Sequence, residues 1–235
     1  MSSIYLVRHG QASFGSANYD ELSDRGRRQS RILGEYLLNT SLPVQALYSG
    51  EMKRQLDTAR EISAAFEERG VCPPPLRILP EFNEYDSAAI VTTLVSELAE
   101  EDPSLLRDIS NMADKKAFQR AFELLVGRWV GGDFRTSDLP RWEDFKNRVR
   151  HGLDKVKREN GRGKNILVFT SGGPISAAVQ ASLGLSDLMA VKMSWQVINT
   201  SLTRLIYSED RLTLASFNNA AHLELAGDAS LITYR

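Results

Sequence analysis

Short apolar runs alternate with longer stretches of helical periodicity along most of this chain, and this alternation restricts its fold more than any other feature. The predicted strands cover residues 4–7, 44–48, 76–79, 165–169, 200–207 and 211–217, with a hairpin turn at 208–210. The predicted helices begin after Ser23, span about 51–69 and 142–159, and begin again at Pro174. Repeated strand–helix units predict a three-layer α/β fold, in which a mainly parallel sheet has helices on both faces.

The stretch 86–141 interrupts this alternation because it carries no strand signal. Its apolar spacing predicts helices at about 87–99, 103–112 and 115–130, which Asp102-Pro103 interrupts and Gly131-Gly132 ends. A chain of 235 residues suits a single domain. We therefore expect one domain over residues 1–235, with a helical insertion at about 86–141 over the active site.

Composition excludes several other classes of protein. The formal net charge of −1 gives no field that would attract nucleic acid. No stretch reaches the roughly 18 apolar residues of a membrane helix, and the N-terminus lacks the pattern of a signal peptide, so a cytoplasmic location is expected. The single cysteine, Cys72, excludes an intramolecular disulfide and any multi-cysteine metal site. The oligomeric state leaves no readable pattern.

Unusual polar residues follow the predicted strands, and ligands of parallel sheets bind beyond the carboxyl ends of the strands. The first strand ends at Arg8-His9-Gly10, where the glycine allows a ligand to approach the backbone closely. A neutral imidazole attacks phosphorus, and the neighbouring guanidinium disfavours the imidazolium form. His9 is therefore a candidate nucleophile, although a lone histidine is more often structural.

Two further strand ends offer groups that bind anions. Arg54 falls in the first turn of the helix predicted at 51–69, where the helix N-terminus already favours negative charge. Its guanidinium can bind two phosphate oxygens, whereas the alternative is an ordinary surface arginine. After the strand at 165–169, Ser171-Gly172-Gly173-Pro174 predicts a curled backbone whose N–H groups point at an anion, with Pro174 as the first helical residue.

A carboxyl-rich loop, 80–86, follows the third strand and could supply a proton. A phosphate ester needs its leaving oxygen protonated, and nearby negative charge raises the pKa of a carboxyl toward that task. Glu84 and Glu81 are both candidates for the proton donor, and an acidic loop facing water is the alternative.

Taken together, these motifs resemble the histidine phosphatase superfamily, in its phosphoglycerate mutase-like branch. Residues 6–12 are similar to that family's N-terminal signature, and residues 22–29 to its "L-T-x-x-G-x-x-Q" helix start. Residues 49–59 are similar to its "S-S-x-x-x-R-A-x-x-T-A" segment. The resemblance implies a phosphohistidine on His9, with Arg8 and Arg54 holding the phosphoryl oxygens. Glu84 is the favoured proton donor, because Glu84-Tyr85-Asp86 resembles the family's "E-x-D" step.

One departure from the family pattern affects the candidate site. Ser171 stands where the family's "S-H-G-G" has a second histidine, and a serine can donate a hydrogen bond but carries no charge. Losing such a donor typically costs about 10²–10³ in rate. Ser171 and Gly172 remain candidate phosphate-binding residues, and Ser171→His is expected to raise the rate if the side chain faces the pocket. His222 is a candidate source of the missing imidazole, with a structural role as the alternative.

The favoured function is a phosphatase that hydrolyses a small phosphate monoester. The alternatives are a catalytically weakened protein that binds phosphate esters, for which Ser171 argues, and a phosphoglycerate mutase-type phosphotransferase. The resemblance implies no cofactor and no metal, and His9, His151 and His222 are too scattered in the sequence to suggest one. The expected partner is a small phosphorylated substrate.

Overall fold

The computed structural model describes residues 2–13, 20–111, 114–134 and 139–234, and its centre is a six-stranded sheet. The strands lie in the order β3-β2-β4-β1-β5-β6. They are β1 (Ser2–Arg8), β2 (Ala46–Ser49), β3 (Leu76–Ile78), β4 (Asn165–Thr170), β5 (Leu202–Tyr207) and β6 (Leu212–Asn219). The first four are parallel, whereas β5 is antiparallel to both of its neighbours. The predicted α/β fold with a mainly parallel sheet is confirmed.

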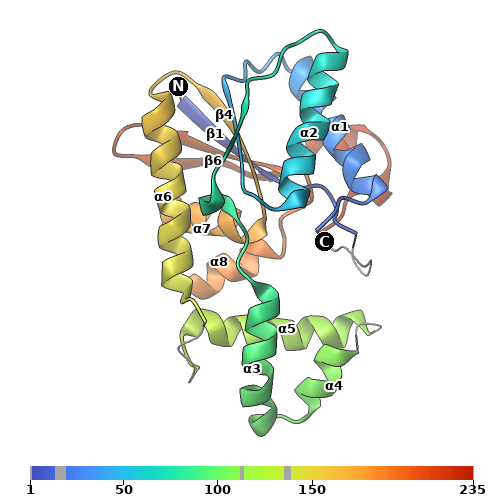
Figure 1. Ribbon diagram of the computed structural model, residues 1–235, viewed down its shortest axis with the longest axis vertical. Coiled ribbons are helices and arrows are strands. Elements are labelled where there is room, and N and C mark those ends of the chain that lie inside the picture. The colour runs from blue at the N-terminus through green and yellow to red at the C-terminus, as the bar shows by residue number, and fades with distance from the viewer. Residues whose placement is uncertain (1, 14–19, 112–113, 135–138, 235) are drawn as a thin grey trace.

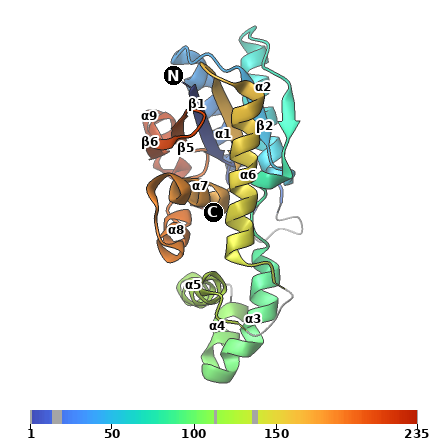
Figure 2. The ribbon, with the colours of Figure 1, turned by 90° about the vertical axis from the view of Figure 1, so that its left-hand side faces the viewer.

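Helices cover both faces of the sheet (Figures 1 and 2). One face carries α1 (Asp24–Asn39) and α2 (Lys53–Glu68), and the other carries α6 (Trp142–Asn160), α7 (Gly172–Leu183) and α8 (Asp187–Ser194). Val7 of β1 belongs to the core that includes α1 and α2, and its neighbour Leu6 belongs to the core that includes α6 and α7. Both faces of β1 are therefore buried, which explains its uninterrupted apolar sequence.

Local chemistry fixes where α1 begins. The Ser23 hydroxyl accepts a hydrogen bond from the Gly26 N–H at 3.1 Å, as the sequence predicted for an N-cap. Three short elements, η1 (Pro80–Phe82), α9 (Ala221–Leu225) and η2 (Ala229–Leu231), were not predicted, and neither was α8. Among the described residues, no helix combines the length and apolar character needed to cross a bilayer.

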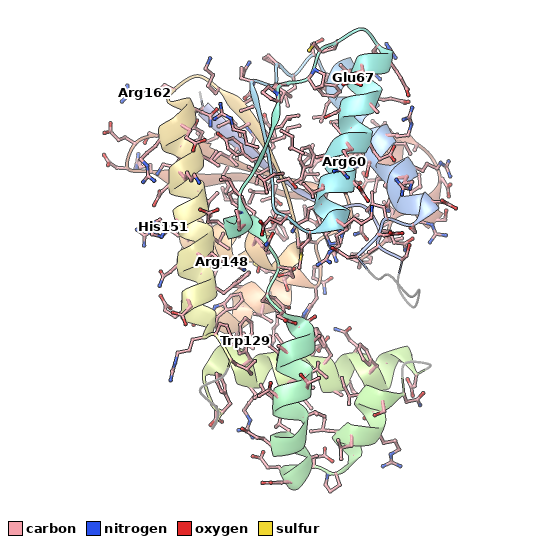
Figure 3. All side chains as sticks on the ribbon, viewed as in Figure 1. Arg60, Glu67, Trp129, Arg148, His151 and Arg162 are labelled. Carbon is pink, nitrogen blue, oxygen red and sulfur yellow. The ribbon has the colours of Figure 1, made fainter. Side chains whose placement is uncertain are left out.

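The predicted helical stretch contains α3 (Ser87–Glu101), α4 (Ser104–Ser110) and α5 (Lys115–Gly131), which we call the helical lobe. Residues 112–113 and 135–138 of the predicted insertion lie outside the described residues. Figures 1 and 2 place the lobe beyond the carboxyl ends of the parallel strands. Trp129 of the lobe, labelled in Figure 3, packs on Tyr85 with ring centroids 5.0 Å apart and on Trp142 at 5.4 Å. The lobe therefore shares its core with the sheet.

The beginning of α7 corrects one expectation. The helix begins at Gly172, with Ser171 as its N-cap residue, so Pro174 is the third helical residue instead of the first. A proline fits here because no backbone N–H in the first turn of a helix has an intrahelical partner. Gly172 and Gly173 are helical, so the predicted curled backbone does not form, and the N–H groups here are those of an ordinary helix N-terminus.

Candidate active site

His9 lies immediately after β1, with only 5% of its surface exposed. Its Nδ1 is 2.8 Å from the Gly10 carbonyl oxygen. A carbonyl only accepts, so Nδ1 carries the proton and Nε2 carries the lone pair. Burial is the largest cause that lowers the pKa of His9 well below its ordinary value, and the charges of Arg54 and Arg8 lower it further. The ring is therefore a neutral imidazole with a nucleophilic nitrogen at Nε2.

Arg54 faces that nitrogen from the first turn of α2. Its Nε donates to Nε2 of His9 at 3.2 Å, and its Nη1 binds the Asp20 carboxylate at 2.6 Å. The other oxygen of Asp20 accepts from the Lys53 N–H at 2.8 Å, so one carboxylate fixes both the guanidinium and the start of α2. The arginine is 7% exposed, which makes it a buried cation beside the imidazole and excludes the surface alternative.

Arg8 ends β1 and supplies the second positive charge. Its Nη1 donates to the Val197 carbonyl, and its position in the sheet is fixed by pairing with Thr170 at the end of β4. The Thr170 carbonyl in turn accepts from the His9 N–H at 2.9 Å. The ends of β1 and β4 therefore hold Arg8 and His9 at one edge of the sheet.

Glu84 places a carboxyl beside these cations. Its Oε2 accepts from the Gly173 N–H at 3.0 Å, and its Oε1 accepts from the Tyr85 N–H at 3.1 Å. Burial is the largest cause and raises the pKa of Glu84, while the Gly173 N–H and the charges of Arg54 and Arg8 lower it. Burial prevails, so this carboxyl retains a proton to higher pH than an exposed glutamate.

Glu81, the other candidate acid, points elsewhere. Its Oε1 is 3.9 Å from Nζ of Lys155 on α6, and its Cβ packs against Gly152 of the same helix. Of the two glutamates, only Glu84 therefore faces the two guanidinium groups.

This arrangement gathers groups suited to binding an anion. A neutral imidazole, two guanidinium groups and a carboxyl with a raised pKa face one edge of the sheet, and α2 and α7 both begin there. Within the described ranges, no three histidine, cysteine or acidic side chains gather as a metal site would require.

A family model described as the histidine phosphatase superfamily (branch 1) matches residues 4–220. The chain belongs to this superfamily. Three similar solved structures share its fold over almost the whole chain. A phosphoglycerate mutase from Bacillus anthracis str. Sterne has a TM-score of 0.65 at 17% identity, covering 97% of each chain.

The other two structures are phosphatases. A mutant phosphoserine phosphatase from Entamoeba histolytica in complex with phosphoserine has a TM-score of 0.65 at 18% identity, covering 95% of this chain and 100% of that one. A mycobacterial glucosyl-3-phosphoglycerate phosphatase with inorganic phosphate has a TM-score of 0.62 at 19% identity, covering 94% and 98%. At such identities the structures establish the shared fold alone.

The superfamily motif glycine of α1 has a steric reason in this structure. A Cβ atom on Gly26 would lie 2.2 Å from the Gln11 carbonyl oxygen, and one on Gly10 would lie 2.4 Å from that of Gly26. Both positions need glycine so that the start of α1 can touch the loop carrying His9.

His222 does not replace the histidine that the superfamily pattern has at Ser171. Its ring is 2% exposed, with Nε2 2.9 Å from the Thr200 hydroxyl and its centroid 5.9 Å from that of Tyr36. Burial lowers the pKa of His222 to about 4. This neutral, packed position corresponds to the structural alternative.

Sequence reasoning missed the residues that hold the His9 loop in place. The Gln11 N–H donates to Oε1 of Gln29 at 2.9 Å, and Nε2 of Gln29 donates to the Thr233 hydroxyl at 2.8 Å. That hydroxyl donates to Oδ1 of Asn199 at 2.9 Å, and Nδ2 of Asn199 donates to the His9 carbonyl at 2.9 Å. Gln29 belongs to a recognised motif, whereas no pattern singled out Asn199 or Thr233.

Proposed function

We propose that this member of the histidine phosphatase superfamily hydrolyses a small phosphate monoester through a phosphohistidine on His9. The observation that carries the proposal is the buried, neutral imidazole whose Nε2 lone pair faces Arg54. An incoming phosphoryl oxygen takes over the Arg54 N–H that now binds this nitrogen. The phosphorus atom then lies next to the nucleophile.

In the first step, Nε2 of His9 attacks phosphorus, and the bond to the ester oxygen breaks. Glu84 gives its proton to that oxygen, so the alcohol leaves neutral. Arg8 and Arg54 balance the charge on the three non-bridging oxygens. In the second step, a water molecule gives a proton to the Glu84 carboxylate while its oxygen attacks phosphorus. The phosphorus–nitrogen bond breaks, which releases inorganic phosphate and restores both side chains.

The experiment that tests the intermediate uses an aryl phosphate carrying a labelled phosphoryl group. The wild-type protein is expected to retain label after an alkaline quench and to lose it in acid, because a phosphoramidate bond is stable to alkali and labile to acid. His9→Ala should retain none. Label that survives acid and is lost in alkali would indicate a serine or threonine ester and would overturn the proposal.

The pH profile of kcat/KM is expected to peak on the acid side of neutrality. The reaction needs neutral His9, whose pKa is lowered, so activity persists as the pH falls well below the ordinary range of histidine. It also needs protonated Glu84, whose pKa is raised, so activity falls as the pH rises through that value. Measuring kcat/KM for an alkyl phosphate from pH 4 to 9 checks this, and an optimum above pH 8 would contradict it.

The mutase alternative is tested with the wild-type protein. This protein shares its fold with a phosphoglycerate mutase, and the two phosphatases described above were solved with phosphoserine or inorganic phosphate. Phosphoserine and 3-phosphoglycerate are therefore suitable first substrates. Release of inorganic phosphate supports the phosphatase, whereas an isomeric phosphate ester without release would indicate a mutase. Phosphate binding without turnover would indicate the weakened binding protein.

A further inference from the structure

Three departures from the superfamily pattern meet in this structure. Gly50 stands at the second serine of the "S-S" pair, Gln55 stands at the alanine after the arginine, and Ser171 stands at the second histidine. Gly50 follows β2, Gln55 lies in α2 and Ser171 follows β4. Although the positions are up to 121 residues apart in the sequence (171 − 50), their side chains or backbone are in contact.

Gln55 is the centre of this group. It is fully buried, and its Nε2 donates to the Ser171 hydroxyl at 2.8 Å and to the Phe82 carbonyl at 3.1 Å. The carbonyl can only accept, so the side-chain nitrogen, and not the oxygen, faces Ser171. The Ser171 oxygen therefore accepts from Gln55, and its own proton remains available to donate.

Gly50 provides the space for the other end of this amide. A Cβ atom at position 50 would lie 2.1 Å from Oε1 of Gln55, closer than atoms can approach. The described part of the chain offers that oxygen no hydrogen-bond donor. The glutamine is therefore held by its nitrogen and by packing, and a serine at position 50 would displace it.

Gln55 and an imidazole at position 171 compete for one space. The Ser171 oxygen occupies the place where a histidine side chain in the same rotamer would have its Cγ, and Nε2 of Gln55 lies only 2.8 Å from it. The ring atoms beyond Cγ would overlap the amide. With the side chain 1% exposed, position 171 has no solvent into which that ring could turn without moving its neighbours.

Position 171 lies between two residues that contact the site. The Thr170 carbonyl accepts from the His9 N–H, and the Gly173 N–H donates to Glu84. The backbone of Ser171 is therefore adjacent to residues that contact His9 and Glu84.

We propose that Gly50, Gln55 and Ser171 form a compensated cluster that replaces the second histidine: Gln55 fills the space of the missing imidazole and orients Ser171, whose hydroxyl donates to a phosphoryl oxygen. Gln55 is a positioning residue, because it acts through Ser171. The inference rests on the proposed function, because the donor is assigned to that reaction.

The test compares wild type, Gln55→Ala, Ser171→His and the double variant Gln55→Ala/Ser171→His in hydrolysis of an aryl phosphate. Each single substitution is expected to lower kcat by about 10-fold or more, since one removes the orienting amide and the other forces a ring against it. The double variant is expected to recover at least the wild-type kcat. This result differs from the expectation from the sequence, in which Ser171→His alone raises the rate if the side chain faces the pocket, and the measurement distinguishes the two. Gln180→Ala, which removes another largely buried amide, is the control and should keep the wild-type kcat.

The pH profile separates this role from a merely structural one. In the double variant, the charged imidazolium is the active form, so kcat should gain a limb that falls as the pH rises through the pKa of the new ring. Wild type has no titrating group at position 171, so its activity should fall at high pH through Glu84 alone and lack this second limb. Thermal unfolding of all four proteins shows whether a change in kcat follows from lost folding.

Two results would overturn the proposed cluster. In the first, the loss of kcat in the double variant equals the product of the losses in the two single variants. In the second, the kcat of Ser171→His alone exceeds that of wild type. Failure of the proposed function looks different, because His9→Ala would then keep the wild-type rate. In that event the same four proteins are compared by calorimetric titration with inorganic phosphate. Weakened phosphate binding in both single variants and recovered binding in the double variant would support the cluster. A loss of affinity in the double variant that equals the product of the two single losses would overturn it.

Discussion

Replacing His9 with alanine is expected to lower kcat for an aryl phosphate by at least about 10⁴-fold, in line with losses of catalytic nucleophiles in other hydrolases. The side chain is the only imidazole that faces Arg54 within the described residues, and its Nε2 forms the bond to phosphorus in the proposed mechanism. KM should change far less than kcat, since Arg8 and Arg54 remain to bind the phosphate. Steady-state hydrolysis at several pH values measures both constants.

His151→Ala is the matched control. This histidine is exposed on the outer side of α6, away from the sheet (Figure 3), and its removal should leave kcat unchanged. Equal losses in the two variants would point to a contaminating phosphatase or to unfolding. Wild-type activity in His9→Ala would refute the assignment of the nucleophile.

Glu84→Gln is expected to lower kcat according to the leaving group. For an alkyl phosphate, whose alkoxide is a poor leaving group, the loss should be about 10²–10⁴-fold, the usual contribution of a general acid. For an aryl phosphate such as a nitrophenyl ester, the leaving oxygen needs little protonation, and formation of the phosphoenzyme should slow by less than about 10-fold. The glutamine keeps the size of the side chain and can still accept from the Gly173 N–H.

The variant Glu81→Gln distinguishes proton donation by Glu84 from a general effect of acidic residues in the same loop. Glu81 packs toward Lys155 and Gly152, so both substrates should be hydrolysed at wild-type rates. A pre-steady-state burst of the aryl alcohol isolates the first step. If Glu84→Gln slowed the burst equally for good and poor leaving groups, Glu84 would not be the proton donor.

Much of the site could be predicted because it depends on short-range chemistry. The apolar run before Arg8 and His9 gives a buried strand, and the strand's end defines where both residues lie. Arg54 was placed in the first turn of α2 because the helical spacing after residue 51 was clear. The rule that parallel strands end at one edge then brought segments from β1, β2 and β4 together.

Contacts between side chains distant in sequence could not be predicted. Nothing near Gln55 in the sequence indicates that its amide reaches Ser171, because the two meet only after α2 and β4 pack together. Pro174 was expected to be the first residue of its helix, but proline is tolerated throughout the first turn, so it marks that turn and not its first residue. The loop sequence by itself left both Glu84 and Glu81 as candidates, and only the resemblance favoured Glu84; the directions of the two side chains follow from packing that the loop sequence does not encode.

The hydrogen bonds through Gln29, Thr233 and Asn199 that fix the His9 loop have a consequence for when the site can form during biosynthesis. The imidazole leaves the ribosome early, but the amide that holds its carbonyl belongs to Asn199, and the hydroxyl that orients this amide belongs to Thr233. A nascent chain that has not yet reached Asn199 and Thr233 contains His9 without the groups that hold its loop in place. We therefore expect a chain truncated before Asn199 to contain His9 without the contacts that fix its loop.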